Sequence, residues 1–274
     1  MKIGLALGAG GARGLAHIIV LETLDELGLK PVQITGTSMG AIIGACYAAG
    51  MSGKDLRRYT LDLFRDRAKV MGALLQTRVG KFADLFSRNP GNPAMIDGEK
   101  MLDLFWPDQV PDRFDQLAIP FRAIATDFFG RKVRVFDEGA LVTGVAASMA
   151  IPGLVRPISA GGAVMVDGAV VNPLPFEYLD KADLKIGVEV TGGPRADTIG
   201  VPEAFEALFG SSQIMMGAIV QEKLKNARPD ILLFPPIDDF AVLDFFRAKE
   251  ILDASAGIAD ELKHALDAAL TASR

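Results

Sequence analysis

A serine stands between two glycines, each two residues away, in the segment Gly36-Thr37-Ser38-Met39-Gly40. The apolar run before this segment predicts a strand, and the small apolar residues after it predict a helix. A G-x-S-x-G turn between a strand and a helix is typical of a nucleophile elbow, in which the serine hydroxyl stands clear of the backbone. Ser38 would also lie at the positive end of the helix, where a developing anion is favoured. The segment indicates a nucleophilic serine, and an ordinary glycine-rich turn is the alternative.

A second glycine-rich segment, Gly8 to Gly14, also lies between a predicted strand and a predicted helix. Its backbone N–H groups suit either a dinucleotide phosphate or the oxyanion of an acyl-transfer intermediate. A dinucleotide fingerprint needs a third glycine where Arg13 stands, and an acidic residue at the end of the second strand. The second predicted strand, "PVQITG", ends without a carboxylate. The pattern favours an oxyanion hole, and a dinucleotide-binding protein is kept as a remaining alternative.

A nucleophilic serine needs a base, and the chain has two histidines. His17 falls inside the first predicted helix, and His264 falls in a charged helix near the C-terminus. The histidine of a serine triad on this kind of sheet is expected in a loop after a strand, which fits neither position. We therefore expect structural or solvated roles for both histidines.

A carboxylate can replace histidine if it reaches the serine in a site dry enough to raise its pKa. Asp167, in Asp167-Gly168-Ala169, follows the predicted strand "AVMV" and is the candidate base, although an Asp-Gly pair is commonly only a turn. Two other aspartates have simpler explanations. Asp97 is expected to cap the helix "GEKMLDLF", and Asp127 is expected to form an Asx turn in a hairpin.

The motifs "GAGGARG", "GTSMG" and "DGA", in this order, resemble those of the patatin-like phospholipases, bacterial branch, and "ASMAIP" at 147–152 matches a further stretch of that family. The resemblance covers residues 2 to about 190. It implies a lipid acyl hydrolase that cleaves carboxylic esters through a Ser-Asp dyad and an acyl-enzyme. It also implies the site residues, with Ser38 as nucleophile, Asp167 as base, Gly36 and Gly40 in the nucleophile elbow, and Gly10, Gly11 and Arg13 as oxyanion donors. Ala9 stands where plant-type members have the first of three glycines, which leaves the set of oxyanion donors open.

The composition narrows the class of protein. A chain of 274 residues with 50% hydrophobic residues can bury a large core, and its net charge of −5 argues against a general nucleic-acid binder. Cys46 is the only cysteine, so no intramolecular disulfide can form, and with two histidines no zinc-site spacing is found. We expect Cys46 to be a small buried hydrophobe, and we expect a cytoplasmic protein without metal or cofactor, secretory signal or membrane-spanning helix.

Strand and helix patterns alternate along the chain. They predict an α/β fold, a three-layer and mostly parallel sheet with helices on both faces, in one domain over residues 1–274. Hairpins are expected around "DFFGR" and around Gly161 and Gly162. Residues 52–116 are expected to form a helical, cap-like insertion that includes one helix over "VMGALLQTRVGKFADLF".

This insertion carries much of the positive charge. Residues 51–88 contain nine Lys or Arg against four Asp. One interpretation is that these charged side chains simply form the solvent-exposed faces of helices. The more specific one is that the insertion rests on an anionic lipid surface. The expected partner is thus a lipid or another acyl ester, with peripheral membrane contact as the sharper hypothesis and the oligomeric state left open. A catalytically weak regulatory or scaffold protein on the same fold is the other main alternative.

Overall fold

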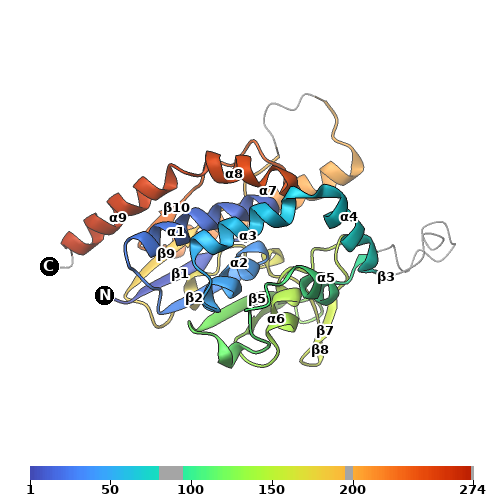
Figure 1. The fold of residues 1–274 in the computed structure, drawn as a ribbon, viewed down its shortest axis with the longest axis horizontal. Coiled ribbons are helices and arrows are strands. Elements are labelled where there is room, and N and C mark those ends of the chain that lie inside the picture. Colours follow the sequence, from blue (N-terminus) through green and yellow to red (C-terminus); the bar gives the residue numbers. More distant parts are fainter. Residues whose placement is uncertain (80–94, 195–199, 273–274) are drawn as a thin grey trace.

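The structure is a computed structural model, in which residues 1–79, 95–194 and 200–272 are described. Within these ranges, an eight-stranded sheet runs through the molecule in the order β10-β9-β1-β2-β5-β8-β7, with β6 paired to β5 (Figure 1). The strands are β1 (Ile3–Leu7), β2 (Gln33–Thr37), β5 (Phe121–Asp127), β6 (Lys132–Phe136), β7 (Ile158–Ala160), β8 (Ala163–Asp167), β9 (Leu184–Val188) and β10 (Ile231–Leu233).

The sheet has a parallel half and an antiparallel half. Strands β10, β9, β1, β2 and β5 run parallel to one another, as expected for strands joined through helices. The hairpins β5–β6 and β7–β8 and the pair β5–β8 are antiparallel. Both predicted hairpins are confirmed, and strand β8 joins the parallel half only through β5.

Helices cover both faces of the sheet, as predicted. They are α1 (His17–Glu26), α2 (Met39–Ala48), α3 (Gly53–Arg65), α4 (Arg67–Gln76), α5 (Gly98–Phe105), α6 (Leu141–Ser148), α7 (Ala204–Asn226), α8 (Ala248–Ala254) and α9 (Ile258–Ala272). Short 3-10 helices, η1 (Gly11–Ala16) and η4 (Gly168–Val170) among them, lie in the loops. No described helix combines the length and the apolar character needed to cross a bilayer.

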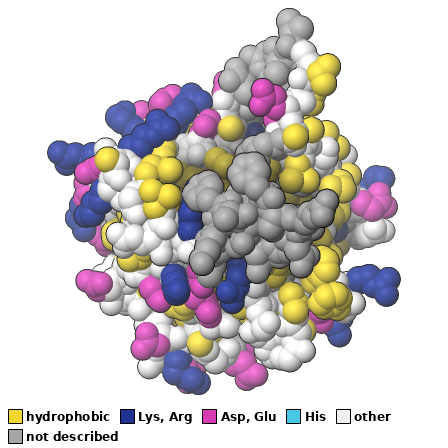
Figure 2. Space-filling model, turned by 90° about the vertical axis from the view of Figure 1, so that its right-hand side faces the viewer, with side chains coloured by type: hydrophobic (Ala, Val, Ile, Leu, Met, Phe, Trp, Pro, Cys, Tyr) yellow, Lys and Arg dark blue, Asp and Glu magenta, His cyan; other side chains and the backbone are white. Residues whose placement is uncertain are grey.

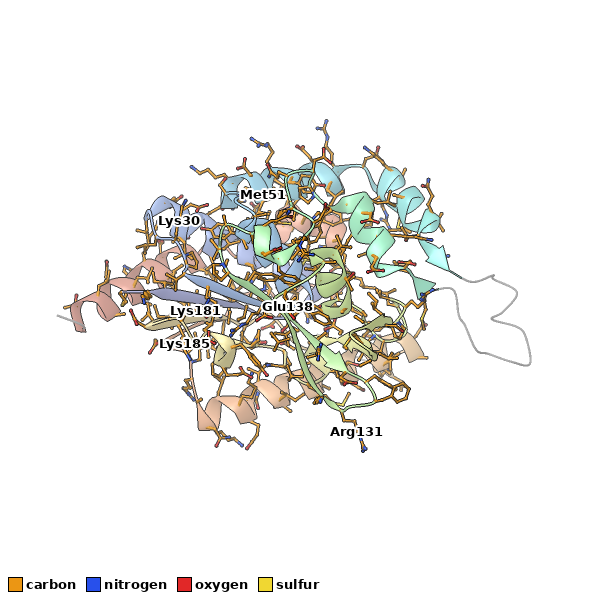
Figure 3. All side chains as sticks on the ribbon, turned by 90° about the horizontal axis from the view of Figure 1, so that it is seen from below. Lys30, Met51, Arg131, Glu138, Lys181 and Lys185 are labelled. Atoms are coloured by element: carbon orange, nitrogen blue, oxygen red, sulfur yellow. The ribbon has the colours of Figure 1, made fainter. Side chains whose placement is uncertain are left out.

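The side chains of β1 alternate between the two faces of the sheet, and each face has its own apolar cluster. Leu5 and Leu7 belong to a large apolar cluster shared with α1, α2, α6, α8 and α9. Ala6, between them, points to the other face because successive strand side chains alternate. There it joins a smaller cluster with Leu174 and with Val220 of α7. Helix α7 thus covers the face opposite α1 and α2, and Figure 3 shows it below the sheet.

Figure 3 also shows the direction of the strands. Lys30, Lys181 and Lys185, which precede or begin strands, lie toward one end of the molecule. Arg131, in the turn after β5, lies toward the other end. The carboxyl ends of the parallel strands therefore gather on one side, which is where α/β folds place their ligand sites.

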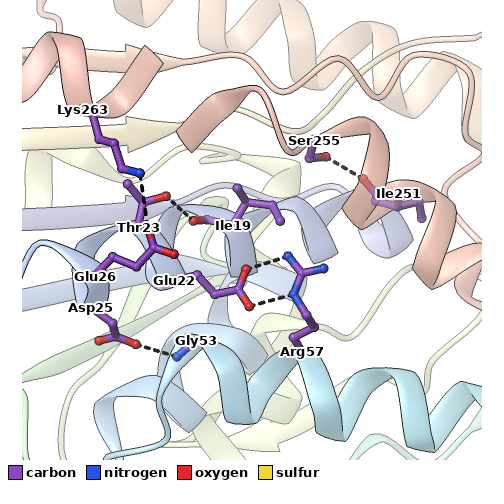
Figure 4. A network of polar contacts seen from close by, with 10 residues as sticks. All are labelled: Ile19, Glu22, Thr23, Asp25, Glu26, Gly53, Arg57, Ile251, Ser255 and Lys263. Carbon is purple, nitrogen blue, oxygen red and sulfur yellow. Dashed lines mark hydrogen bonds and ion pairs between the residues drawn. The ribbon is translucent and has the colours of Figure 1, made fainter. Parts of the chain in front are cut away.

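Polar contacts hold α3 on α1 (Figure 4). Arg57 donates to both carboxylate oxygens of Glu22, at 2.7 and 2.6 Å, and the N–H of Gly53 donates to Asp25 at 2.7 Å. Lys263 of α9 contacts Glu26 of the same helix α1 at 3.2 Å. Helix α3, the first helix of the basic segment (residues 51–88), is therefore attached to the sheet layer through α1.

The helix expected over "VMGALLQTRVGKFADLF" is wrong at residues 77–79, and its part from residue 80 on lies outside the described residues. Helix α4 ends at Gln76, because Thr77 closes the last turn with both its N–H and its hydroxyl on the Leu74 carbonyl. Strand β3 (Arg78–Val79) then pairs antiparallel with β4 (Met95–Ile96). Lys81, Asp84, Arg88 and the apolar run 82–86 lie outside the described residues.

Candidate active site

Ser38 occupies a strained turn between β2 and α2. Its backbone angles are φ 56° and ψ −120°, in a region that L-residues rarely adopt. Among the described residues other than glycine, only Ser38 and Arg131 have a positive φ. This is the geometry expected of a nucleophile elbow, and it fits the predicted strand–serine–helix order.

The two glycines of the motif allow the turn to close. A Cβ at Gly36 would lie 2.4 Å from the carbonyl oxygen of Gly40. A Cβ at Gly40 would lie 2.2 Å from the carbonyl oxygen of Leu7 in β1. Both distances are shorter than van der Waals contact, so neither position can hold a larger residue unless the backbone moves. Gly36 and Gly40 therefore let helix α2 start directly against the sheet.

Asp167 reaches Ser38 through the pairing of the strands. Thr37 of β2 pairs with Ile124 of β5, and Ala125 of β5 pairs with Asp167 of β8, so the serine and the aspartate are at the same level of the sheet. The Ser38 hydroxyl donates to Asp167 Oδ2 at 2.7 Å. The other carboxylate oxygen, Oδ1, accepts from the N–H of Ala169 at 2.8 Å. The structure thus brings the two predicted residues into direct contact.

The pair is almost completely buried, with Ser38 5% and Asp167 4% exposed. Burial raises the pKa of Asp167 to about 6, although the hydrogen bonds from Ala169 and Ser38 act in the opposite direction. At neutral pH the carboxylate is therefore ionised, yet it is more basic than a solvated aspartate. A group with this pKa can both accept and return a proton near neutral pH.

Two further residues hold the dyad in place and were not predicted from the sequence. Ser148 Oγ accepts the N–H of Ser38 at 3.0 Å and donates to the Ile124 carbonyl at 2.6 Å, which ties the strained elbow to β5. The Thr126 hydroxyl donates to the Asp167 carbonyl at 2.9 Å. Ser148 belongs to the "ASMAIP" stretch, so a signal was present there, but its position in the sequence does not reveal this contact.

The glycine-rich segment lies beside the elbow. A Cβ on Gly14 would lie 2.8 Å from Cβ of Met39, the first residue of α2. Gly10 caps the 3-10 helix η1, and Gly11 opens it. The first N–H groups of a helix have no partner within it, so these two are suited to bind an anion. The N–H of Arg13 instead donates to the Gly10 carbonyl at 3.2 Å.

The side chain of Arg13 is buried and points to the C-terminal part of the chain. Its guanidinium donates to three backbone carbonyls, those of Phe240 at 2.6 Å, Thr191 at 2.7 Å and Gly193 at 2.8 Å. The side chain of Arg13 thus links the glycine-rich segment to the loops after β9 and β10. The oxyanion roles of Gly10, Gly11 and Arg13 stay predictions.

The two histidines have the structural or solvated positions expected of them. His17 is fully buried, and its Nε2 lies 2.8 Å from the Gly8 carbonyl, to which it donates. Burial lowers the pKa of His17 to about 4, so the ring is neutral at neutral pH. His264 is exposed on α9, which Figure 1 shows at the end of the sheet opposite the elbow.

The simpler explanations also hold for the other residues considered. Asp97 caps α5 by accepting the N–H of Lys100 at 3.2 Å, and Asp127 accepts the N–H of Gly130 at 2.8 Å in the hairpin turn. Cys46 is buried, and burial raises the pKa of its thiol to about 12. Over the described part of the chain, no group of three or more His, Cys, Asp or Glu side chains is placed to hold a metal ion.

The family model of the patatin-like phospholipases matches residues 5–180, which include the glycine-rich segment, the elbow and Asp167. The chain belongs to the patatin-like phospholipase family. It is 37% identical over 201 residues to an uncharacterized NTE family protein of Mycobacterium tuberculosis, an alignment that covers 72% of this chain and 52% of that protein. It is 29% identical to human patatin-like phospholipase domain-containing protein 6, over 92% of this chain and 19% of the human protein.

Among solved structures, VipD from Legionella pneumophila matches with a TM-score of 0.48 at 14% identity, over 95% of this chain and 66% of that one. The type III effector protein ExoU matches with a TM-score of 0.44 at 13% identity, over 96% of this chain and 53% of that one. The chain spans about half the length of the mycobacterial relative and about a fifth of the human one.

Proposed function

We propose that the protein is a lipid acyl hydrolase in which Ser38 and Asp167 form the catalytic dyad. The observation that supports this best is the buried hydrogen bond of 2.7 Å from Ser38 Oγ to Asp167 Oδ2 at a strained elbow. Membership of the patatin-like phospholipase family suggests an ester of a lipid as the substrate. The reaction needs a nucleophile, a base and an oxyanion site, and each has a candidate in this chain.

In the first half of the reaction, Ser38 Oγ attacks the ester carbonyl while its proton moves to Asp167 Oδ2. The carbonyl oxygen becomes an oxyanion, which the N–H groups of Gly10 and Gly11 are suited to bind. When the tetrahedral intermediate collapses, the C–O bond to the alcohol breaks and Asp167 returns the proton to the leaving oxygen. The products of this half are the free alcohol and an acyl group on Ser38.

In the second half, water replaces the alcohol. Asp167 takes a proton from the water as its oxygen attacks the acyl carbon, and the Ser38 Oγ–acyl bond breaks. The serine oxygen then regains its proton from Asp167. A carboxyl group with a pKa of about 6 suits both steps, since it accepts and returns a proton once in each half of the cycle.

The test is the hydrolysis of a p-nitrophenyl acyl ester by four proteins: wild type, Ser38→Ala, Asp167→Asn and the double variant. Members of one catalytic unit are not additive, so each single variant is expected to lose at least about 10³-fold in kcat, and the double variant little more. If Asp167→Asn retains wild-type turnover, Asp167 is not the base. If wild type has no activity on esters of any chain length tested, the scaffold alternative holds instead.

We also propose that the enzyme meets its substrate at a lipid surface, through the side where the parallel strands end. Large apolar side chains are exposed in the β5–β6 turn and on α7, namely Phe128 (54%), Phe129 (74%), Leu208 (57%), Ile214 (62%) and Met215 (59%). Figure 2 looks onto this side of the molecule and shows yellow side chains at several places around the grey ones. Apolar side chains of this kind can enter the interface of a lipid layer.

The basic segment supports this proposal less than its charge suggests. Arg57 is paired with Glu22, and Arg67 lies 5.0 Å from the ring of Phe246. Flotation with vesicles separates the two contributions. Docking through apolar side chains predicts binding that survives high salt and is lost in Phe129→Ser together with Met215→Ser. Docking through charge predicts binding that rises with anionic lipid, falls with salt and is weakened by Arg58→Gln with Arg65→Gln. If wild type does not float with any vesicle, the proposal is wrong.

A further inference from the structure

Lys223 of α7 holds the segment that follows the candidate base. Its ammonium nitrogen lies 2.5 Å from Asn172 Oδ1, 2.7 Å from the Leu174 carbonyl and 2.7 Å from Glu177 Oε2. Glu177 Oε1 lies 2.9 Å away as well, so four acceptor atoms on three residues surround an ammonium group that has three N–H donors, and its full donor capacity is used. The side chain is 21% exposed, and its nitrogen lies 4.9 Å from the centre of the Phe176 ring. Lys223 is therefore a fixed attachment point, unlike a solvated lysine.

Asn172 connects Lys223 to both members of the dyad. Asn172 is 1% exposed. Its backbone N–H donates to the carbonyl of Gly168, the residue after Asp167, at 2.8 Å. Its backbone carbonyl accepts a hydrogen bond from the hydroxyl of Thr37, the residue before Ser38, at 3.0 Å. One buried asparagine thus binds the chain neighbour of the base and the chain neighbour of the nucleophile.

The side chain of Asn172 has no freedom left. Its Oδ1 accepts from Lys223, and its Nδ2 donates to Glu177 Oε1 at 2.8 Å. The next carbonyl along the chain, that of Pro173, accepts the N–H of Ala9 at 2.9 Å. The segment that Lys223 fixes is therefore also in contact with the glycine-rich segment that we propose to supply the oxyanion donors.

We propose that Lys223 is a positioning residue for catalysis: by fixing Asn172, it sets the distance and direction between Ser38 Oγ and Asp167 Oδ2. This inference rests on the proposed function. It assigns a task to the C-terminal half of α7, which the family match over residues 5–180 does not include. Lys223 does not touch the reacting atoms, so its loss affects the rate of the chemical step and leaves substrate binding nearly unchanged.

Removal of the ammonium in Lys223→Met leaves Asn172 Oδ1, Glu177 and the Leu174 carbonyl without their common donor. A displacement of about 1 Å in a reacting group can cost a hundredfold in rate. We therefore expect kcat to fall at least about tenfold, with KM within about twofold of wild type. Lys223→Arg restores a donor to the same acceptors and is expected to recover part of the loss.

Lys225→Met is the matched control. Lys225 lies two residues along the same helix, is 71% exposed and pairs only with Glu222 of α7 among the described residues, at 2.6 Å. Because the two variants remove the same charge from the same helix, a difference between them reports the contacts of Lys223. Lys225→Met is expected to behave as wild type in kcat and KM.

The experiment measures turnover per active serine. The reactive serines in each preparation are first counted with a fluorophosphonate probe, and kcat is then expressed per labelled serine with a p-nitrophenyl acyl ester. A residue that only stabilises the fold would lower the number of labelled serines and leave this ratio unchanged. Equal kcat per labelled serine in Lys223→Met and Lys225→Met would therefore overturn the inference.

If Lys223→Met does not fold, Glu177→Gln decides the question. It keeps the size of the side chain but places an amide group where Lys223 and Asn172 now share a carboxylate. We expect kcat per labelled serine to fall in this variant too, and an unchanged value would overturn the inference. A wild type with neither labelling nor ester hydrolysis would overturn the proposed function first, whereas an active wild type beside an unaffected Lys223→Met would overturn only the role of Lys223.

Discussion

Ser38 and Asp167 are 129 positions apart in the sequence, yet Ser38 Oγ donates to Asp167 Oδ2 at 2.7 Å. The strands β2, β5 and β8 bring them to one level of the sheet, since Thr37 pairs with Ile124 and Ala125 pairs with Asp167. The carboxylate is held on its other oxygen by the N–H of Ala169.

The pH dependence of the reaction should follow Asp167. Because burial raises the pKa of this carboxyl to about 6, kcat/KM is expected to rise as pH increases through about 6 and to level off above it. A histidine base would give a similar curve, so the profile is measured in His264→Gln as well. We expect the same curve in that variant. A curve that disappears in His264→Gln, in a protein that is still folded, would contradict the dyad.

The same carboxyl should reduce the stability of the fold at neutral and alkaline pH. Its folded pKa of about 6 lies above the unfolded value of about 3.9, so its favourable contribution is complete below pH 4 and is lost as pH rises through 6. The loss amounts to about 3 kcal/mol in the free energy of unfolding, by about 1.4 kcal/mol per pKa unit. Asp167→Asn is therefore expected to be more stable than wild type at pH 8.

Urea unfolding of both proteins at pH 8 and pH 5 measures this difference. The advantage of Asp167→Asn should be large at pH 8 and should shrink markedly at pH 5, where the folded wild type is already mostly protonated. The variant would then be more stable and nearly inactive, as expected when a buried charge is kept for function. An advantage that does not change with pH, or a variant less stable at pH 8, would contradict the raised pKa.

Much of the site could be predicted from the sequence because its motifs are local. The order strand, Gly36 to Gly40, helix is contained in one short segment, and it predicts the elbow that the structure has at Ser38. Asp167 could be proposed because it ends a strand and precedes a glycine. Its contact with Ser38 could not be derived from these local patterns, since it depends on the order in which β2, β5 and β8 pair.

The remaining differences come from contacts between distant parts of the chain. Ser148 and Lys223 carry no local pattern that would reveal their partners, which are 110 and 51 positions away. The predicted helix is wrong at residues 77–79 because the apolar spacing continues through Thr77, while the turn at Thr77 and the pairing of β3 with β4 end helix α4. Apolar spacing reports which residues face a core, and it does not report where a turn interrupts the helix.

Arg13 should be needed for the fold as well as for the site. Its buried guanidinium donates to the carbonyls of Phe240, Thr191 and Gly193, so Arg13→Met leaves three carbonyls without their donor. An unsatisfied buried polar group costs about 1–3 kcal/mol, and we expect Arg13→Met to lose at least about 3 kcal/mol in the free energy of unfolding. Arg58→Met, at a side chain 75% exposed, is the control and should lose less than about 1 kcal/mol. Equal losses in the two variants would contradict the role of Arg13.

Cys46 should report opening of the core. It is the only cysteine, and burial raises the pKa of its thiol to about 12, so the reactive thiolate is scarce in the folded protein. A thiol reagent should label the native protein far more slowly than the protein in denaturant. Mass spectrometry of the labelled fraction over time measures this ratio. Rapid labelling of the native protein would show that the first helices open readily, contrary to their burial.

The central claim is that Ser38 is the nucleophile and that Asp167 activates it. The most direct measurement is the rate of labelling by a fluorophosphonate probe at pH 8, with the modified peptide identified by mass spectrometry. We predict one adduct, on Ser38, formed at least about 10²-fold more slowly in Asp167→Asn and absent in Ser38→Ala. An adduct on another serine, or equal labelling rates in wild type and Asp167→Asn, would contradict the account.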